Sequence, residues 1–374
     1  MLSNRFAAAP FALLRPDYFY RQLHLGRGRA PIKAEPLRAI LSLYELTLLE
    51  PAQALSNQGR NDSLILHTHA GKKILKRYKP GMDAEAVEHE HSILSYLAQV
   101  NFPAPRLWPT AEGPTFVQPD AHCYAIFDWL EGTFQYHHYF LLPKQTLGFI
   151  AAAGEALSRL HQALETFEPA GRNLNGFQSL SGQRWRDFDW CFNQLQKFQQ
   201  TWSTLPTSHR QQLGAFLLKH GDWLENRLLE LSHILQNSPL SRVIIHGDYG
   251  PYNLLFNQNA PAVIIDFELA RLDWRLSDLA KALPMFARNR FGFNLRKAEA
   301  FLNGYWAASP HASTEMAFLH PVWEFLLLRR IIACCDRYYQ TGATRWLQEA
   351  QFKLTDAHWL IQSPQMRVIQ NFAG

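Results

Sequence analysis

The chain has 374 residues, of which 47% are hydrophobic and 18% are charged. This composition excludes a disordered chain and a collagen-like or low-complexity polymer, and the length allows one large domain or two ordinary ones. The net charge of +5 comes from residues 1–40, which hold seven basic and two acidic residues, because the rest of the chain holds 30 of each. A balanced body offers no basic excess for a phosphate backbone, so we expect no nucleic-acid partner.

The cysteines and the apolar stretches predict a compartment. The four cysteines lack CxxC spacing and the density of a disulfide scaffold, which favours a reducing environment. The longest apolar stretches are broken by Arg329 and Arg330, so no segment is expected to cross a bilayer. We therefore expect a cytoplasmic protein with no membrane partner, and the sequence does not indicate an oligomeric state.

Residues 1–34 predict an irregular N-terminal extension, because arginine, proline, glycine and aromatic residues are mixed there without a sustained period. An organelle-targeting segment is the alternative, since the stretch is rich in arginine. Asp17 and the prolines argue against that alternative.

Residues 35–131 predict a β-rich lobe with one strong helix. Helical apolar spacing covers residues 35–49, and Asp83 is placed to cap a second helix that reaches residue 100. Strand-like runs occupy residues 64–69, 73–77, 115–118 and 124–130.

Residues 132–374 predict a larger, mainly helical lobe. Helical periodicity covers residues 144–165, 185–200, 207–236, 276–287, 294–307, 316–340 and 343–361. Short β-type runs interrupt it at residues 242–245, 254–256 and 262–265. A small β-rich part joined near residues 128–132 to a larger helical part is an α+β organisation with two lobes.

Two buried apolar runs in the second lobe each end in an aspartate. These residues are Asp248 and Asp266, and Asn253 begins the strand between them. Asn253 and Asp266 offer oxygen ligands, which Mg²⁺ prefers to nitrogen or sulfur. Asp248 lies on a glycine-containing loop from which it can approach the same site without binding the metal. That placement suits a catalytic residue that orients a hydroxyl nucleophile and accepts its proton during phosphoryl transfer.

The combination of His246-Gly-Asp-x-x-x-x-Asn253 with Ile265-Asp-Phe-Glu268 resembles the aminoglycoside phosphotransferase and choline kinase family of protein-kinase-like enzymes. The motifs are variants of the HRDxxxxN catalytic loop and the DFG metal motif, in the same order. The resemblance implies a protein-kinase-like two-lobe α+β fold, with a small antiparallel sheet lobe and a larger helical lobe. It also implies that ATP and Mg²⁺ serve to transfer the γ-phosphoryl group to a hydroxyl of a small molecule.

The strand at residues 73–77 tests this resemblance independently, because a kinase needs a lysine on its small sheet. Alternation along the strand places Ile74 and Lys76 on one face and Leu75 on the other. We therefore expect Leu75 to face the core, and the resemblance implies that Lys76 clamps the α- and β-phosphates.

A kinase also needs a glutamate on the helix beside that strand. Glu90 falls on the apolar stripe of the predicted helix, where a carboxylate is costly unless it meets a cation. We expect Lys76 to be that cation, and the resemblance implies the same ion pair. Glu88, away from the centre of the stripe, is the alternative.

The resemblance implies three further nucleotide contacts. The turn around Asn61 occupies the place of the family's phosphate-covering loop, although it lacks the GxGxxG pattern. The linker between the lobes resembles the family's hinge, so the backbone of Asp128 and Leu130 is expected to bind adenine. Ile74 is expected to pack on the adenine ring.

The acceptor classes that remain open are amino sugars, amino alcohols, sugars, homoserine-like compounds and thiosugars, because variable helices build acceptor pockets in this fold. An acidic, aromatic wall for a cationic amine is one hypothesis, and its members are Trp185, Trp190, Asp273 and Trp274. Core packing is the alternative for each tryptophan. Glu268 is expected either to line the acceptor pocket or to cap its strand.

A metal-dependent hydrolase is a second interpretation of the same motifs. In it, His246 and Asp248 bind a metal and His161 is a third ligand. This interpretation gives no role to Lys76 or Asn253, and it is disfavoured because satisfied structural histidines are commoner.

A non-catalytic kinase-like structural or assembly protein of the spore-coat type is the hypothesis from a different class, and residues 184–202 carry a weak resemblance to that branch. A protein kinase is disfavoured, because no Ala-Pro-Glu motif or long activation segment follows Asp266. Asp278 is expected to brace the catalytic loop from the next helix.

Overall fold

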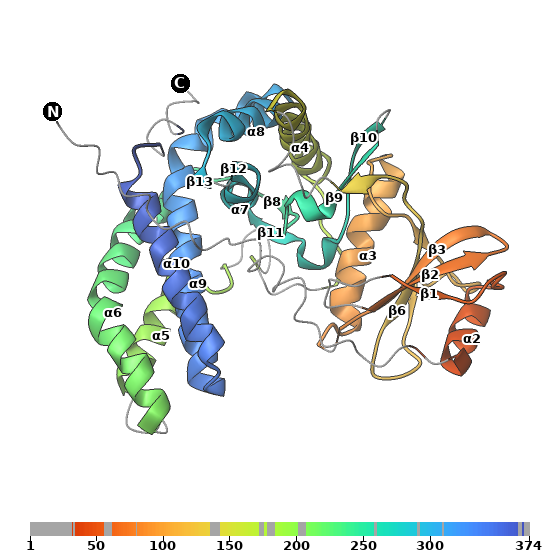
Figure 1. The fold of residues 1–374 in the computed structure, drawn as a ribbon, viewed down its shortest axis with the longest axis horizontal. Helices are drawn as coiled ribbons and strands as arrows, with labels where there is room; N and C mark the ends of the chain where they lie inside the picture. Colours follow the sequence, from red (N-terminus) through yellow and green to blue (C-terminus); the bar gives the residue numbers. More distant parts are fainter. Residues whose placement is uncertain are drawn as a thin grey trace.

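The computed structural model describes residues 32, 34–55, 62–79, 81–134, 143–171, 176–177, 184–200, 207–257, 260–289, 292–308, 310–365 and 369. The predicted extension of residues 1–34 lies outside these ranges apart from residues 32 and 34, and so does Asn61. Figure 1 shows a sheet with two helices beside a larger group of helices. This arrangement agrees with the predicted two-lobe α+β fold.

The smaller lobe is built on an antiparallel sheet. Its strands follow the order β1-β2-β3-β6-β4, and β5 also pairs with β6. The strands are β1 (Gln53–Ala54), β2 (Asp62–Thr68), β3 (Gly71–Arg77), β4 (Leu107–Trp108), β5 (Phe116–Val117) and β6 (Tyr124–Asp128). The four predicted strands are confirmed with small shifts at their ends, while β1 and β4 are too short to leave a periodic signal.

A helix covers each face of this sheet, so the central strand β6 is buried on both sides (Figure 1). Tyr124 and Ile126 belong to the core cluster of α2 (Ala34–Leu43), whereas Ala125 and Phe127 belong to the cluster of α3 (Ala84–Gln99). Successive residues of one strand thus serve two cores.

The predicted helix of residues 35–49 is too long at its end. The helix α2 stops at Leu43, and Glu45 adopts a left-handed backbone with φ 53°. The apolar spacing continues because Leu46 packs into the same core as the helix. Beyond Leu43 the periodicity therefore reports burial and not helix.

The helix α3 begins where the sequence predicts. The side chain of Asp83 accepts a hydrogen bond from the backbone N–H of Ala86 at 2.9 Å, which caps the helix. The buried face of the helix includes Val87, Glu90 and Leu94, so the stripe that carries the predicted glutamate is the one that faces the core.

The larger lobe is mainly helical. Its helices are α4 (Pro143–Ala163), α5 (Phe188–Gln200), α6 (Thr207–Gln236), α7 (Leu276–Phe286), α8 (Leu295–Ala308), α9 (Leu319–Thr341) and α10 (Thr344–Gln362). The α4 helix packs against α8, and α9 packs against α6, α7 and α10. The predicted helices are confirmed, except that the one expected from residue 316 starts as a 3₁₀ segment, η6 (Pro310–Phe318).

Two glycines allow α4 and α8 to cross at close range. A β-carbon on Gly154 would collide with the backbone oxygen of Phe301, and one on Gly304 would collide with that of Ala151. The backbones are in contact here, which a larger residue would prevent.

Short ribbons carry the predicted catalytic motifs. The strand β8 (Arg242–Ile245) pairs with β11 (Arg271–Trp274). A second ribbon has the order β10-β9-β7 and joins β7 (Thr133–Phe134), β9 (Leu254–Asn257) and β10 (Ala260–Ile264). The strand β11 was not predicted, because its alternating charged residues do not show the apolar pattern of a buried strand.

The chain crosses between the lobes after Asp128, where β6 ends, and reaches the larger lobe at β7. The crossing includes residues 131 and 132, and the domain boundary predicted between them stays a prediction. None of the helices in the described ranges is both long and apolar enough to span a membrane.

Candidate active site

A buried carboxylate holds the predicted catalytic loop that follows β8. Asp278 of α7 accepts hydrogen bonds from the backbone N–H groups of His246 at 2.7 Å and Gly247 at 2.8 Å. Burial opposes ionisation of Asp278, but the hydrogen bonds from His161 and Gly247 lower its pKa below the ordinary value. The predicted brace is therefore present.

The two histidines of the hydrolase interpretation are used within the fold. The N–H of Asp248 donates to Nδ1 of His246, and Nε2 of that ring donates to the carbonyl oxygen of Ile265 at 2.9 Å. His161 is buried between the hydroxyl of Tyr305 at 2.8 Å and Asp278 at 3.2 Å. Both rings have structural roles, so the hydrolase interpretation loses its nitrogen ligands.

Asp248 lies on the loop with two polar neighbours. The hydroxyl of Tyr252 donates to its Oδ1 at 3.1 Å, and Nδ2 of Asn253 donates to its backbone oxygen at 2.9 Å. Burial raises the pKa of Asp248, and the positive charge of Lys281 is the largest opposing effect. A carboxylate with a raised pKa accepts a proton more readily, which fits a general base.

Asn253 and Asp266 place oxygen atoms beside this loop. Because Nδ2 of Asn253 donates to the loop, its amide oxygen is the atom left to ligate a cation. The N–H of Ile265 donates to the carbonyl of Asn253 at 3.0 Å, which joins the two segments. Asp266 has left-handed backbone angles, φ 65° and ψ 68°, which are uncommon for a residue other than glycine. Its side chain is 40% exposed.

The donor set fits Mg²⁺. An amide oxygen and a carboxylate match the hard ligands of this ion, which keeps water and substrate phosphates for its remaining positions. In the part of the chain that the structure describes, no group of three or more His, Cys, Asp or Glu side chains could hold a different metal.

Lys76 of β3 bridges the lobes. Its Nζ lies 3.0 Å from Oε1 of Glu90 and 3.5 Å from Oδ1 of Asp266. Burial alone would lower the pKa of Lys76, but the carboxylates of Glu90, Asp266 and Glu268 raise it above the ordinary value. The expected contact between Lys76 and Glu90 is present, and Glu88 is exposed.

Two backbone N–H groups of the predicted hinge, those of Asp128 and Trp129, already donate hydrogen bonds within the protein. Asp128 pairs with Lys73 at 2.5 Å, and its backbone N–H donates to the oxygen of Arg106 at 3.0 Å. The N–H of Trp129 donates to the backbone oxygen of Lys72. The next backbone N–H along the hinge is that of Leu130.

The predicted adenine face is on β3. Leu75 is fully buried in the core cluster of α2, whereas Ile74 is half-buried on the opposite face. Ile74 therefore shares the side of the strand that carries Lys76.

Glu268 belongs to a second contact between the lobes. Its Oε1 lies 2.6 Å from Nζ of Lys79, which follows β3. Nε2 of His89 on α3 bonds the backbone oxygen of Ala270 at 3.1 Å in the same region. The sequence predicts that Glu268 lines the acceptor pocket or caps its strand, and it does not predict this ion pair. The two residues are 189 positions apart, so no local pattern connects them.

The hypothesis of an acidic wall is wrong at its acidic residue. Asp273 has no exposed surface and pairs with both Arg184 and Arg271. The strand β11 turns this carboxylate inward, which the sequence pattern did not predict.

The tryptophans of that wall are already covered by cations of the protein. The guanidinium of Arg186 lies 4.2 Å from the ring centre of Trp185 and 5.0 Å from that of Trp190, and Arg184 lies 4.4 Å from that of Trp274. The wall is therefore positively charged.

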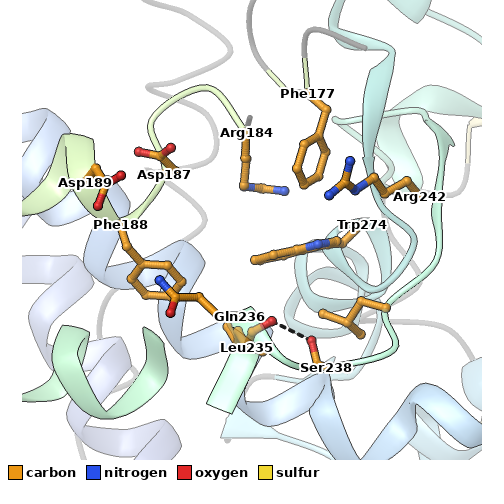
Figure 2. Close-up of a pocket in the computed structure, with 11 residues that line it drawn as sticks. Phe177, Arg184, Asp187, Phe188, Asp189, Leu235, Gln236, Ser238, Arg242 and Trp274 are labelled. Atoms are coloured by element: carbon orange, nitrogen blue, oxygen red, sulfur yellow. Dashed lines mark hydrogen bonds between the residues drawn. The ribbon is translucent and has the colours of Figure 1, made fainter. Parts of the chain in front are cut away.

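A cavity of about 260 Å³ lies beside this wall. Figure 2 shows Phe177, Arg184, Arg242 and Trp274 around it. Arg242 and Trp274 pair at one end of the β8–β11 ribbon, and the predicted catalytic loop leaves the opposite end at Ile245. Asp248, Asn253 and Asp266 do not line this cavity. The cavity is therefore separate from the residues of the predicted transfer site.

Lys281 lies beside the predicted catalytic loop, and the sequence analysis did not identify it. Its Nζ donates to the backbone oxygen of Gly247 at 2.6 Å. Burial, with the charge of Arg271, lowers the pKa of Lys281 to about 7. No signal pointed to it, because a lysine in an amphipathic helix is ordinarily a surface residue.

The sequence pattern of the phosphotransferase enzyme family (APH) matches residues 52–318. A homoserine kinase of Caulobacter vibrioides (strain NA1000 / CB15N) is 29% identical over 288 residues, which cover 76% of this chain and 81% of that protein.

Two solved structures share the fold. An amicoumacin kinase in complex with AMP-PNP, Ca²⁺ and Ami is 14% identical with a TM-score of 0.59, over 89% of this chain and 95% of that one. A microcompartment-associated aminopropanol kinase is 17% identical with a TM-score of 0.58, over 89% and 99%. The kinase-like two-lobe fold is thereby confirmed, and the chain belongs to the phosphotransferase enzyme family as a small-molecule kinase.

Proposed function

We propose that this kinase transfers the γ-phosphoryl group of ATP to a hydroxyl of a small amino alcohol, amino sugar or sugar-like acceptor, with Mg²⁺ as the metal. The observation that carries the proposal is the position of Lys76, whose Nζ lies 3.0 Å from Glu90 and 3.5 Å from Asp266. A nucleotide between the lobes would meet the lysine and the metal-binding carboxylate together.

The nucleotide would be bound mainly by the smaller lobe. Lys76 would contact the α- and β-phosphates, and Glu90 would keep its ammonium in place. Ile74 would pack on adenine, and the hinge backbone at Asp128 and Leu130 would provide hydrogen bonds. The donor at Leu130 is favoured over that of Asp128, whose N–H already bonds Arg106. The phosphate contact of Asn61 stays a prediction from the resemblance, because this residue lies outside the described ranges.

The metal would be held by Asn253 and Asp266. When bound, Mg²⁺ would neutralise charge on the phosphate oxygens during transfer. Asp248 would accept a hydrogen bond from the acceptor hydroxyl, orient it towards the γ-phosphorus and take its proton. Tyr252 and Asn253 would fix the orientation of Asp248 through their hydrogen bonds.

The names of two similar kinases favour some of the acceptor classes over others. Homoserine and aminopropanol, the acceptors in the names of two similar kinases, are short alcohols with an amine. Both belong to the acceptor classes that the sequence left open.

An ADP-release screen over amino alcohols, hydroxy amino acids, sugars and aminoglycosides tests the proposal. Asp248→Asn keeps the shape of the side chain but removes the proton acceptor, so turnover should fall about 10²–10⁴-fold. Circular dichroism should show an unchanged fold. Equal ADP release by the two proteins with every acceptor would refute the role of Asp248.

Binding of an ATP analogue to the same purified protein distinguishes a kinase from a non-catalytic scaffold of the spore-coat type. An active kinase should bind an ATP analogue more tightly with Mg²⁺ than without it, whereas a scaffold should bind it weakly or independently of the metal.

A further inference from the structure

The peptide group that joins Gly247 to Asp248 is held at both of its polar atoms. Its carbonyl oxygen, which belongs to Gly247, accepts a hydrogen bond from Nζ of Lys281 at 2.6 Å. Its N–H, which belongs to Asp248, donates to Nδ1 of His246 at 3.2 Å. A peptide group is planar, so these two hydrogen bonds fix the direction in which the chain enters Asp248.

The helix α7 contributes two neighbouring contacts to this part of the loop. Lys281 lies three positions after Asp278, so both side chains are on the same face of the helix. Oδ1 of Asp278 accepts a hydrogen bond from the N–H of Gly247 at 2.8 Å, and Lys281 donates to the carbonyl oxygen of the same residue. One helix therefore holds Gly247 at both its donor and its acceptor.

Gly247 needs such contacts, because a glycine restricts its own backbone very little. Its φ of 79° lies in the left-handed region. A β-carbon there would collide with the guanidinium of Arg271 and the backbone oxygen of Leu269, so no larger residue fits. The conformation of the chain just before Asp248 therefore depends on the groups that surround this glycine.

The stability of the fold alone does not explain a lysine at position 281. In the part of the chain that the structure describes, the ammonium of Lys281 forms no ion pair, and burial followed by the charge of Arg271 lowers its pKa. A partly buried cation without a counterion costs free energy, so an apolar residue should be tolerated at least as well there. What the lysine contributes is its hydrogen bond to the loop of the proposed base.

We propose that Lys281 is a positioning residue for phosphoryl transfer, which holds the carbonyl oxygen of Gly247 and thereby orients the carboxylate of Asp248 towards the acceptor hydroxyl. The proposal rests on the proposed function, because it takes Asp248 as the proton acceptor. Lys281 acts through the loop and not on the substrates, so its loss should lower kcat and leave nucleotide binding unchanged.

Lys281→Met tests the proposal, because it removes the ammonium and keeps a side chain of similar length. With ATP and the acceptor that the wild type turns over fastest, kcat should fall about 10–100-fold, since a small displacement of a reacting group is costly. The Kd of a non-hydrolysable ATP analogue with Mg²⁺ should stay within about twofold of the wild-type value. Lys281→Arg keeps a cationic donor, so its kcat should be at least about threefold above that of Lys281→Met.

A double-mutant cycle with Asp248→Asn separates a positioning role from a structural one. In Asp248→Asn the proton acceptor is absent, so adding Lys281→Met should cost less than about threefold in kcat. A lysine that only supported the fold would instead cause the same loss in both backgrounds.

Lys297→Met is the matched control. Lys297 is a buried lysine of the next helix, α8, and burial lowers its pKa as well. This variant should keep kcat within about twofold of the wild type. An equal loss of kcat in Lys297→Met and Lys281→Met would count against a specific role of Lys281. If Lys281→Met does not fold, Lys281→Gln removes the charge with a shorter polar side chain and should show the same loss of kcat.

Three results would overturn the proposal and leave the kinase function intact. The first is a kcat of Lys281→Met within about twofold of the wild type. The second is a loss of affinity for the ATP analogue as large as the loss of kcat, and the third is an equal loss of kcat in the two backgrounds of the cycle. Wild-type ADP release no higher than that of Asp248→Asn with all acceptors would instead refute the proposed function.

Discussion

The ion-pair partner of Lys76 is predictable from the sequence, whereas that of Asp273 is not. The sequence predicts that Lys76 meets Glu90, which lies only 14 positions further along the chain. Glu90 falls on the apolar stripe of its helix and needs a cation, and Lys76 is on the strand beside that helix. Asp273 meets Arg184 across 89 positions. Nothing in the local pattern of either residue pointed to that distant ion pair.

His91 provides a prediction about stability at the residue scale. It is buried on α3 between the hydroxyls of Tyr78 at 2.9 Å and Thr115 at 2.7 Å. Burial, with the charge of Lys76, lowers the pKa of His91 to about 3. Between this value and the unfolded pKa of about 6.5, only the unfolded chain takes up the proton. His91 therefore contributes full stability above that range, and the contribution is lost as the pH falls through it.

Denaturant unfolding of the wild type and His91→Gln checks this prediction. The difference in free energy of unfolding between the two should change by about 1.4 kcal/mol for each pH unit below about 6.5, with the wild type losing more. His122→Gln, at a half-exposed histidine, controls for the substitution itself. Parallel curves for the wild type and His91→Gln would show that the ring protonates freely in the folded state.

At the scale of elements, long periodic helices were predictable and short polar strands were not. The spacing of α6 and α10 gave nearly the observed ends, because one face of each helix is buried over many turns. The strand β11 has four residues, two of them buried and charged. Its place depends on pairing with β8 and on ion pairs, which apolar periodicity does not detect.

The crossing of α4 and α8 carries a prediction at this scale. Gly304→Ala should lower the free energy of unfolding by about 1–3 kcal/mol, because the new methyl group would meet the backbone of Ala151 and force the helices apart. Gly148→Ala on α4 is the control, since its added β-carbon meets no atom within 4 Å. That control should be neutral or stabilise by up to about 1 kcal/mol. Equal effects of the two substitutions in thermal or urea unfolding would argue against close contact of the helices.

At the scale of the whole molecule, polar contacts join the two lobes around the proposed transfer site, beside an apolar core that includes residues of both lobes. Lys76 reaches Asp266, Lys79 reaches Glu268, and His89 reaches Ala270. The first contact followed from the motifs together with the family resemblance. The other two were not predicted, because they depend on how α3 packs on η5 (Phe267–Leu269).

Magnesium-dependent nucleotide binding tests most directly whether Lys76 and Asp266 serve the same nucleotide. Calorimetric titration with a non-hydrolysable ATP analogue should show that Mg²⁺ raises the affinity of the wild type at least about tenfold, a gain of about 1.4 kcal/mol. In Asp266→Asn that gain should fall below about twofold, and Lys76→Met should weaken binding at saturating Mg²⁺ by about tenfold or more. An unchanged gain from Mg²⁺ in Asp266→Asn, with wild-type affinity in Lys76→Met, would contradict the account.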